Sequence, residues 1–226
     1  MTEPSAADVL LSTVRTYKRR SGRVTASQQQ ALDVDSTHFD LADCSWTDIQ
    51  RRAGDAEIVV DIGFGFGESV LHYAQAQPAR FIVGLEVHLP GVGALCRDAA
   101  TAGLSNIGVL NVDARQWLAD VVPDAALSGV RLFFPDPWPK KRHHKRRFIR
   151  RPVLDLLASR CAAGAFLHIA TDISDYADDA QAELAQSPFW HLQAGADHRQ
   201  HRPVTKFERR ANVAQRQVFD ILAYRA

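Results

Sequence analysis

One stretch constrains the fold of this chain more than any other: residues 58–68, which read Ile-Val-Val-Asp-Ile-Gly-Phe-Gly-Phe-Gly-Glu. A β-branched apolar run ends at an acid, passes through three alternating glycines and continues into a helix-like segment. Glycine adopts positive φ without strain and lets a ligand approach the main chain closely. The pattern predicts a strand, a tight turn and a helix, and taken alone it suits a cofactor loop or a purely structural turn equally well.

The spacing of the glycines argues against a dinucleotide. The fingerprint G-x-G-x-x-G places its third glycine at position 68, where this chain has Glu68, and the glycine stands one place earlier at Gly67. A pyrophosphate here would also meet the carboxylates of Asp61 and Glu68, which offset the helix dipole of about 0.3 to 1 kcal/mol. A cofactor with an ammonium, a sulfonium and no phosphate suits both acids. S-adenosylmethionine is that cofactor, and D-x-G-x-G-x-G resembles the first motif of Rossmann-like methyltransferases.

Length and composition predict one main α/β domain in an ordinary soluble protein, because the chain has 226 residues, 46% apolar and 23% charged. No run of 18 apolar residues exists, and residues 1–13 lack the basic start and cleavage site of a signal peptide. We therefore expect a cytoplasmic protein without membrane contact. Cys44, Cys96 and Cys161 are odd in number and far apart, which favours reduced thiols over a disulfide or zinc site.

The net charge is only +1, but the basic residues are unevenly distributed. Five lie between Arg15 and Arg23 and eight between Lys140 and Arg151, with no acid in either block. The first block surrounds Tyr17 and is either a solvated arm or, as we favour, a mobile segment that orders on an anionic polymer. We assign residues 1–55 to a mobile basic arm with short helices at 25–32 and 46–52. Residues 56–226 form the main domain.

From residue 57 onward, strands and helices alternate, which predicts a parallel sheet with right-handed crossovers. The expected strands are 58–61, 80–86, 106–112, 130–134, 165–170, 190–193 and 218–224. The expected helices are 68–77, 91–102, 114–118, 152–162 and 174–186. His143 and His144 belong to the basic surface rather than to a metal pair, because no further ligand is suitably spaced, and we predict no metal site.

Acids follow successive strands of this predicted sheet. Glu86 ends the second strand 19 positions after Gly67, where folds of this kind bind ribose hydroxyls. Asp113 follows the third strand, where it can accept a hydrogen bond from an adenine amino group or cap the next helix. Considered alone, Asp113 favours the cap. Three acids that close three successive strands, Asp61, Glu86 and Asp113, favour the cofactor.

The fourth strand runs into Pro135-Asp136-Pro137-Trp138. Two prolines fix the backbone around the acid and remove main-chain donors, so the carboxylate of Asp136 is held stiffly at the open end of the strand. A fixed acid beside an aromatic ring is typical of a site that holds a planar base. The alternative is a rigid turn with Trp138 packed over it.

Residues 133–147, Phe-Phe-Pro-Asp-Pro-Trp-Pro-Lys-Lys-Arg-His-His-Lys-Arg-Arg, resemble the signature of bacterial tRNA (guanine-N7)-methyltransferases. So does Thr-Lys-Phe-Glu at 205–208, and segments 84–93, 103–106 and 170–172 are also similar to that family. The resemblance covers about residues 57–222 and, more weakly, 20–32. It implies a Rossmann-like class I methyltransferase fold: a mostly parallel seven-stranded sheet with an antiparallel last strand and helices on both faces.

The resemblance also implies roles for single residues. S-adenosylmethionine would be held by Asp61, Gly63, Gly65, Gly67, Glu86 and Asp113, with Asp136 at the methyl-transfer end as catalytic residue. Contacts to tRNA and guanine would come from Lys140, Asp172, Thr205, Lys206, Phe207 and Glu208. One position departs from the family pattern, because Asp61 stands where the relatives usually have Glu. Its shorter side chain leaves both a direct contact and a water-bridged contact open.

The predicted function is methyl transfer from S-adenosylmethionine to N7 of the variable-loop guanine at position 46 of tRNA. An NAD oxidoreductase is disfavoured by the glycine spacing and the acids. A non-catalytic tRNA-binding protein would not need acids at four strand ends, and another methyltransferase would not need the basic block. The predicted partner is tRNA, with no obligate protein partner evident.

Overall fold

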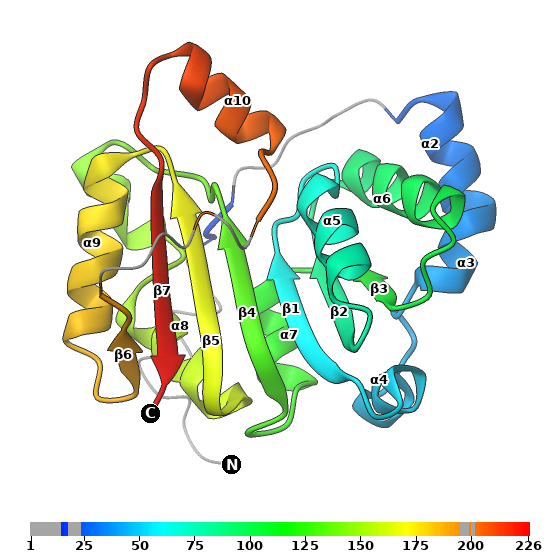
Figure 1. Ribbon diagram of the computed structural model, residues 1–226, viewed down its shortest axis with the longest axis horizontal. Coiled ribbons are helices and arrows are strands. Elements are labelled where there is room, and N and C mark those ends of the chain that lie inside the picture. The colour runs from blue at the N-terminus through cyan, green and yellow to red at the C-terminus, as the bar shows by residue number, and fades with distance from the viewer. Residues whose placement is uncertain (1–14, 18–23, 195–198, 200–201) are drawn as a thin grey trace.

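A computed structural model describes residues 15–17, 24–194, 199 and 202–226 of the chain. A seven-stranded sheet with the order β3-β2-β1-β4-β5-β7-β6 forms the centre of this described part (Figure 1). The strands are β1 (Glu57–Ile62), β2 (Arg80–Leu85), β3 (Ile107–Leu110), β4 (Leu127–Phe133), β5 (Cys161–Thr171), β6 (Trp190–Leu192) and β7 (Phe219–Arg225).

The first five strands are parallel, and β7 runs antiparallel to both of its neighbours, β5 and β6. Parallel neighbours need a crossover, and the helices between consecutive strands provide it. The predicted mostly parallel sheet with an antiparallel last strand is therefore confirmed. The register places Asp61 of β1 opposite Arg131 of β4, so that these two side chains lie on the same face of the sheet.

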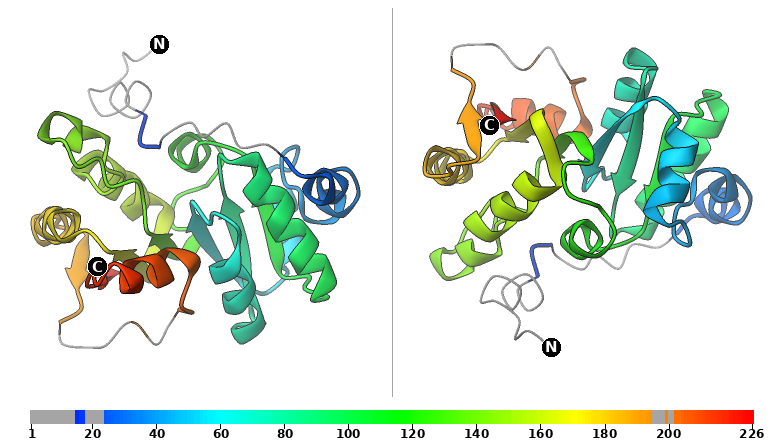
Figure 2. Two further views of the ribbon diagram at one scale, coloured as in Figure 1. Left: turned by 90° about the horizontal axis from the view of Figure 1, so that it is seen from above. Right: turned by 90° about the horizontal axis from the view of Figure 1, so that it is seen from below.

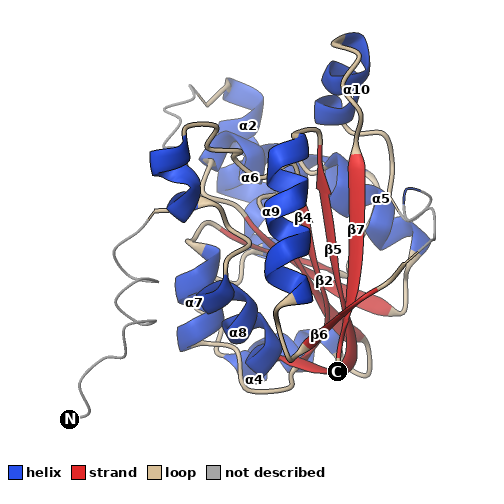
Figure 3. Ribbon diagram, turned by 90° about the vertical axis from the view of Figure 1, so that its left-hand side faces the viewer, coloured by secondary structure: helices blue, strands red, loops and turns tan. Residues whose placement is uncertain are grey.

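Helices cover both faces of the sheet (Figures 2 and 3). In β1, Ile58, Val60 and Ile62 pack into one apolar cluster with α4 (Trp46–Ala53), α7 (Ala114–Asp120), α8 (Arg151–Arg160) and α9 (Ser174–Ala185). Val59 points the other way, into a cluster with α5 (Glu68–Ala76) and α6 (Leu89–Thr101). An apolar run of alternating orientation is what a strand buried on both faces requires.

The helix expected at 25–32 begins where predicted but extends further. Thr25 caps α2 (Ala26–Gln30) by accepting a hydrogen bond from the Gln28 amide, and the helical path continues through η1 (Ala31–Asp35) and α3 (Ser36–Phe39). The extension is stabilised by packing, since Phe39 is buried in the α5–α6 cluster. Gly93 of α6 allows the close approach, because a Cβ there would lie 2.7 Å from the Gln28 carbonyl oxygen.

Two further boundaries differ from the sequence-based expectation. α8 ends at Arg160 and β5 starts directly at Cys161, whose main chain pairs with Leu127 at an irregular start of the β4–β5 ladder. Residues 206–213 form a helix, α10 (Lys206–Val213), where only a polar basic segment was expected. Thr205 begins this helix, because its hydroxyl accepts a hydrogen bond from the Glu208 amide. None of the described helices is long and apolar enough to cross a membrane.

Candidate active site

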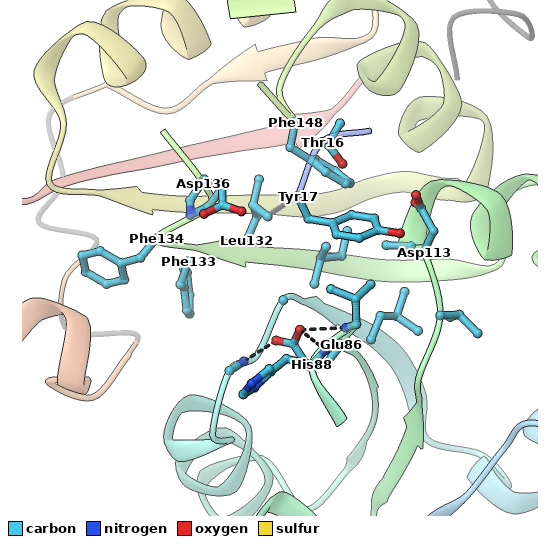
Figure 4. A pocket seen from close by; sticks show the side chains of 18 of the residues that line it. Thr16, Tyr17, Glu86, His88, Asp113, Leu132, Phe133, Phe134, Asp136 and Phe148 are labelled. Atoms are coloured by element: carbon cyan, nitrogen blue, oxygen red, sulfur yellow. Dashed lines mark hydrogen bonds between the residues drawn. The ribbon is translucent and has the colours of Figure 1, made fainter. Parts of the chain in front are cut away.

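A pocket of about 400 Å³ opens at the carboxyl ends of β1, β2, β3 and β4 (Figure 4). This is the edge of an open α/β sheet where ligands bind. Of the predicted site residues, Gly63, Gly65, Glu86, Asp113, Asp136 and Phe207 line it. A second cavity of about 540 Å³ lies around Arg80 and Phe166, and none of the predicted site residues lines it.

The three loop glycines all adopt the left-handed backbone, with φ of +70° at Gly63, +63° at Gly65 and +87° at Gly67. Gly63 and Gly65 line the pocket. Gly67 begins α5 and packs away from the pocket, because a Cβ at this position would lie 2.7 Å from the Leu95 side chain. The predicted loop thus has two glycines that face the ligand space and one that lets two helices approach each other.

Glu86 is buried, with 8% of its surface exposed, and its carboxylate binds three main-chain amides. Oε2 accepts a hydrogen bond from Gly65 at 2.8 Å, and Oε1 accepts from Val87 at 2.7 Å and His88 at 2.9 Å (Figure 4). The side chain therefore connects the end of β2 to the glycine loop. These three hydrogen bonds fix the carboxylate at the pocket wall.

Asp61 lies behind the pocket wall and is not among the lining residues. It is 1% exposed, and its Oδ2 lies 3.0 Å from Nη1 of Arg131. Burial raises the pKa of Asp61 to about 6, while the Arg131 charge acts in the opposite direction. Asp61 is thus placed to hold β1 against β4 beneath the glycine loop.

Of the two roles that the sequence left open for Asp113, the structure shows the helix cap, and the adenine contact stays a prediction. Asp113 caps α7, because Oδ1 accepts a hydrogen bond from the Arg115 amide at 3.0 Å. Its Oδ2 also lies 3.1 Å from Nη2 of Arg115. The residue lines the pocket at the same time, on the side away from Asp136 (Figure 4).

Asp136 lines the pocket from the end of β4. The turn that carries it is bracketed by two non-glycine residues with left-handed backbone, Phe134 at φ +51° and Trp138 at φ +45°. Such conformations cost of order 1 to 3 kcal/mol each and are typical of functional sites. Trp138 is only 6% exposed and packs into the turn, as the rigid-turn alternative requires. That Asp136 acts on a planar base stays a prediction.

α10 contributes one residue to the pocket and anchors the others elsewhere. Phe207 lines the pocket and stacks on Phe134, with ring centroids 6.0 Å apart and planes 19° apart. The Lys206 amide donates a hydrogen bond to Glu68 Oε2 at 2.8 Å, which ties α10 to α5. Glu208 points inward, where its carboxylate pairs with Arg199 at 2.7 Å and with Arg202.

Arg202 is the centre of a buried ion network below α10. Its side chain is completely buried and pairs with Glu208 on one side and Asp220 of β7 on the other, where Nε lies 2.6 Å from Oδ1. Asp220 also lies 3.0 Å from Nε2 of His168. The guanidinium lies 5.5 Å from the centroid of the Phe134 ring. The network thus couples α10, the sheet and the pocket wall.

The remaining two predicted substrate residues lie outside the pocket lining. Asp172 follows β5 and pairs with Arg216, with Nη2 2.7 Å from its Oδ2. Lys140 is exposed and directly precedes the short helix η2 (Lys141–Arg146). Neither residue lines the pocket, so their roles as RNA contacts stay predictions.

Comparison with known proteins gives the family. The profile of a family described as "Putative methyltransferase" matches residues 55–221. A tRNA (guanine-N(7)-)-methyltransferase of Alkalilimnicola ehrlichii is 43% identical over 215 residues, which cover 92% of this chain and 91% of the relative. Enzymes of the same name from Halorhodospira halophila and Sodalis glossinidius are 43% and 40% identical and cover 92% and 94% of this chain. This chain belongs to the tRNA (guanine-N7)-methyltransferase family.

Solved structures of more distant proteins support the fold alone. An antibiotic-related methyltransferase superimposes with a TM-score of 0.56 at 16% identity and covers 82% of this chain and 95% of its own. The 16S rRNA methyltransferase KamB gives a TM-score of 0.55 at 15% identity, with 95% and 98% covered. These neighbours place this family member among methyltransferase folds.

The basic block of this family member divides into two groups. Arg147 is buried and binds the Pro137 carbonyl at 3.1 Å and the Asp175 carboxylate at 2.9 Å. Arg150 and Arg151 also pair with acids of α9 and α8. The exposed residues of the block are Lys140, Lys141, Arg142, Lys145 and Arg151, and Arg151 is the one of these five that pairs with an acid, Asp155.

Several lining residues were missed from sequence, among them Thr16, Tyr17, Asn111 and Phe148. The Asn111 amide donates a hydrogen bond to the Glu86 carbonyl at 2.8 Å and so fixes the end of β2. Its position directly after β3 was the available signal. Tyr17 is the one aromatic residue of the first basic block, but nothing in the sequence places it at the pocket.

Proposed function

We propose that this chain transfers the methyl group of S-adenosylmethionine to N7 of the variable-loop guanine at position 46 of tRNA. The observation that carries the proposal is the match to tRNA (guanine-N(7)-)-methyltransferases at 43% identity over 92% of the chain. The pocket supports it, because the glycine loop, Glu86, Asp113 and Asp136 line one cavity at the carboxyl ends of β1, β2, β3 and β4.

The residues present fit S-adenosylmethionine. Glu86 is a fixed acceptor at the pocket wall, suited to ribose hydroxyls, and Asp113 is an acceptor suited to the adenine amino group. Gly63 and Gly65 leave the main chain open to the methionine end, and the two carboxylates disfavour a phosphate. When bound, the cofactor supplies an electrophilic methyl group on a sulfonium.

Asp136 is the residue that we assign to the chemical step. Guanine N7 carries a lone pair and no proton, so attack on a methyl group needs no general base. The purine gains positive charge as the new bond forms. A carboxylate held in the Pro135–Pro137 turn can stabilise that developing cation and orient the ring without reorganising, and losing help of this kind typically costs about 2.7 to 4 kcal/mol.

The target guanine must leave its stacked position before N7 can reach the pocket. Phe207, stacked on Phe134 at the pocket rim, is the aromatic surface available to a displaced base. Trp138 is buried in the turn and does not offer a free ring face. The exposed cations from Lys140 to Lys145 lie on the chain just beyond this rim and suit the RNA backbone.

Asp136→Asn tests the assignment. We expect the single-turnover methylation rate on a tRNA transcript to fall by about 100- to 1,000-fold, because shape is kept while the stabilising charge is lost. The affinities for S-adenosylhomocysteine and tRNA should stay within a few-fold. Labelled methyl groups should map to 7-methylguanosine at position 46, and 7-deazaguanine at that position should abolish transfer.

Asp124→Asn is the matched control, since Asp124 is an exposed acid that pairs with Arg160 on the surface. A normal rate for Asp136→Asn would assign the carboxylate a purely structural role in its turn. Label in another nucleoside, or on the 7-deaza substrate, would mean that the acceptor atom is wrong. Binding of tRNA without any methyl transfer would favour a non-catalytic protein.

A further inference from the structure

Two described residues of the N-terminal arm lie at the cofactor pocket. Thr16 and Tyr17 line it, although they are more than 40 residues away from the next lining residue, Ile62, in sequence. The Trp138 indole donates a hydrogen bond from Nε1 to the Thr16 carbonyl at 2.9 Å. Trp138 is itself buried, so this donor is a fixed point to which the arm is attached.

The Tyr17 side chain points into the pocket on the side of Asp113 (Figure 4). Phe148 and Leu132 lie on the same side of the cavity, while Glu86 lies on the opposite side. The Arg15 guanidinium lies 5.6 Å from the Tyr17 ring centroid. A large aromatic ring thus borders the part of the pocket that Asp113 and Glu86 mark for the adenosine half of the cofactor.

We propose that Tyr17 is a further cofactor-binding residue, whose ring stacks on the adenine of S-adenosylmethionine, and that Trp138 is the positioning residue that seats it. This inference rests on the proposed function. Val112, Ala114 and Phe148 line the same pocket and supply the aliphatic and phenyl surface that a planar heterocycle needs on its other side. The methyl-transfer end is marked by Asp136 and Phe134, and it lies along β4 from Tyr17.

The assignment explains why Trp138 is buried with its N–H directed at a main-chain carbonyl of a distant segment. Arg146 covers the other part of the indole, with its guanidinium 4.9 Å from the ring centroid, and His143 meets the ring edge at 5.9 Å between centroids. The residues that hold Thr16 and Tyr17 in place therefore belong to the same turn and short helix that carry Asp136 and part of the basic block.

Calorimetric titration with S-adenosylhomocysteine and, separately, with adenosine tests the proposal on the full chain. Stacking of a base on an aromatic side chain is worth about 5- to 150-fold in affinity, so Tyr17→Ala should weaken both ligands by that factor. Tyr17→Phe keeps the ring and should recover most of the affinity. Tyr224→Ala, an exposed tyrosine of β7 outside this pocket, should bind like the wild type.

Trp138→Phe removes the indole donor and should weaken S-adenosylhomocysteine by about 2- to 10-fold, the value of one neutral hydrogen bond. Its effect should disappear in the Tyr17→Ala background, because Trp138 acts through the arm. An equal loss of affinity in both backgrounds would show that Trp138 acts through the Asp136 turn instead, and would overturn its role in positioning Tyr17.

Unchanged binding by Tyr17→Ala would overturn the cofactor contact. Tighter binding by Tyr17→Ala would also overturn it, since the ring would then occupy space that the ligand needs. Both results leave the proposed function intact, provided that the wild type binds S-adenosylhomocysteine and methylates tRNA. A wild type that binds neither ligand would contradict the proposed function itself.

Discussion

The acids that end β1 and β2 differ in their partners and in their access to the pocket. Asp61 is enclosed and pairs with Arg131, whereas Glu86 faces the pocket and is held by main-chain amides. A carboxylate offers about four acceptor sites, and three of those on Glu86 are already used. About one acceptor site is therefore left, and we expect Glu86 to act on the cofactor both through a ribose hydroxyl and by fixing the glycine loop.

Glu86→Gln should weaken S-adenosylhomocysteine by about 10- to 150-fold, the value of a charge-assisted hydrogen bond of about 1.5 to 3 kcal/mol. The amide has one acceptor oxygen, so its nitrogen must face an N–H of Gly65, Val87 or His88. Calorimetry measures the loss. Glu57→Gln is the control, because Glu57 is an exposed acid in the surface pair with Arg80. Equal affinities in both variants would remove Glu86 from the site.

At the scale of elements, α6 sets the position of the glycine loop. A Cβ at Gly91 would lie 2.0 Å from the Gly65 carbonyl oxygen, which is far inside van der Waals contact. This carbonyl oxygen belongs to the main chain, so it cannot rotate away as a side chain could. The loop and the first turn of α6 are therefore one rigid unit, and the loop geometry depends on a residue 26 positions away.

Gly91→Ala should displace the loop and lower the affinity for S-adenosylhomocysteine, by 10-fold or more if the Glu86–Gly65 hydrogen bond is lost. Gly103→Ala is a matched control at the end of α6, where φ is +63° and no atom lies within 4 Å of the added Cβ. That control should lose about 1 kcal/mol of unfolding free energy through backbone strain and keep its affinity. Unaltered binding by Gly91→Ala would refute the coupling.

The ion network below α10 predicts a specific acid sensitivity. Burial alone would raise the pKa of Asp220, but the hydrogen bonds from Arg202 and His168 outweigh it and hold that pKa at about 2, below the usual 3.8. A lowered pKa in the fold contributes stability above pH 3.8, which is lost as the pH falls towards 2. The difference of nearly two units corresponds to roughly 2 kcal/mol.

Urea unfolding between pH 6 and pH 2 measures this contribution. The wild type should lose roughly 2 kcal/mol more than Asp220→Asn over that range, because the variant has no carboxylate to protonate at this position. The comparison uses the change with pH within each protein, since removing one partner of a buried Arg also lowers the absolute stability. Parallel pH profiles for the two proteins would contradict the role of Asp220.

At the scale of the whole molecule, part of the basic block pairs with acids of the fold, and we expect the exposed lysines and Arg142 to contact RNA. Arg147, Arg150 and Arg151 pair with acids of the helical layer, whereas Lys140, Lys141 and Arg142 are exposed next to the active-site turn. A cation that is already paired with a carboxylate of the protein is partly neutralised, so it releases fewer counterions when RNA binds. The number of basic residues in the sequence therefore overestimates the number of phosphates that the block can neutralise.

Replacing Lys140, Lys141 and Arg142 by Gln should flatten the plot of log tRNA affinity against log salt by about two to three units, at 0.7 to 0.9 per phosphate. Binding should weaken similarly across tRNAs, because phosphate contacts carry no base information. Arg150→Gln with Arg151→Gln is the control within the same block and should leave the slope nearly unchanged. Equal slopes in all three proteins would make the exposed group a solvated surface only.

Local signals were sufficient for most of the fold and for part of the site. Apolar strand runs, the three alternating glycines and the acids at strand ends predicted the sheet, the glycine loop and the pocket positions of Glu86, Asp113 and Asp136, because each depends on residues close together in sequence. Pairings across long separations could not be read in this way. The register of β1 against β4 encloses Asp61 with Arg131, the acids of α9 bury Arg147, and Arg202 turns Glu208 inward. Trp138 likewise holds Thr16 across 122 positions. Strand order and helix packing decide these contacts, because a charged side chain is buried only where the folded chain brings it a partner, and a linear pattern does not contain that partner.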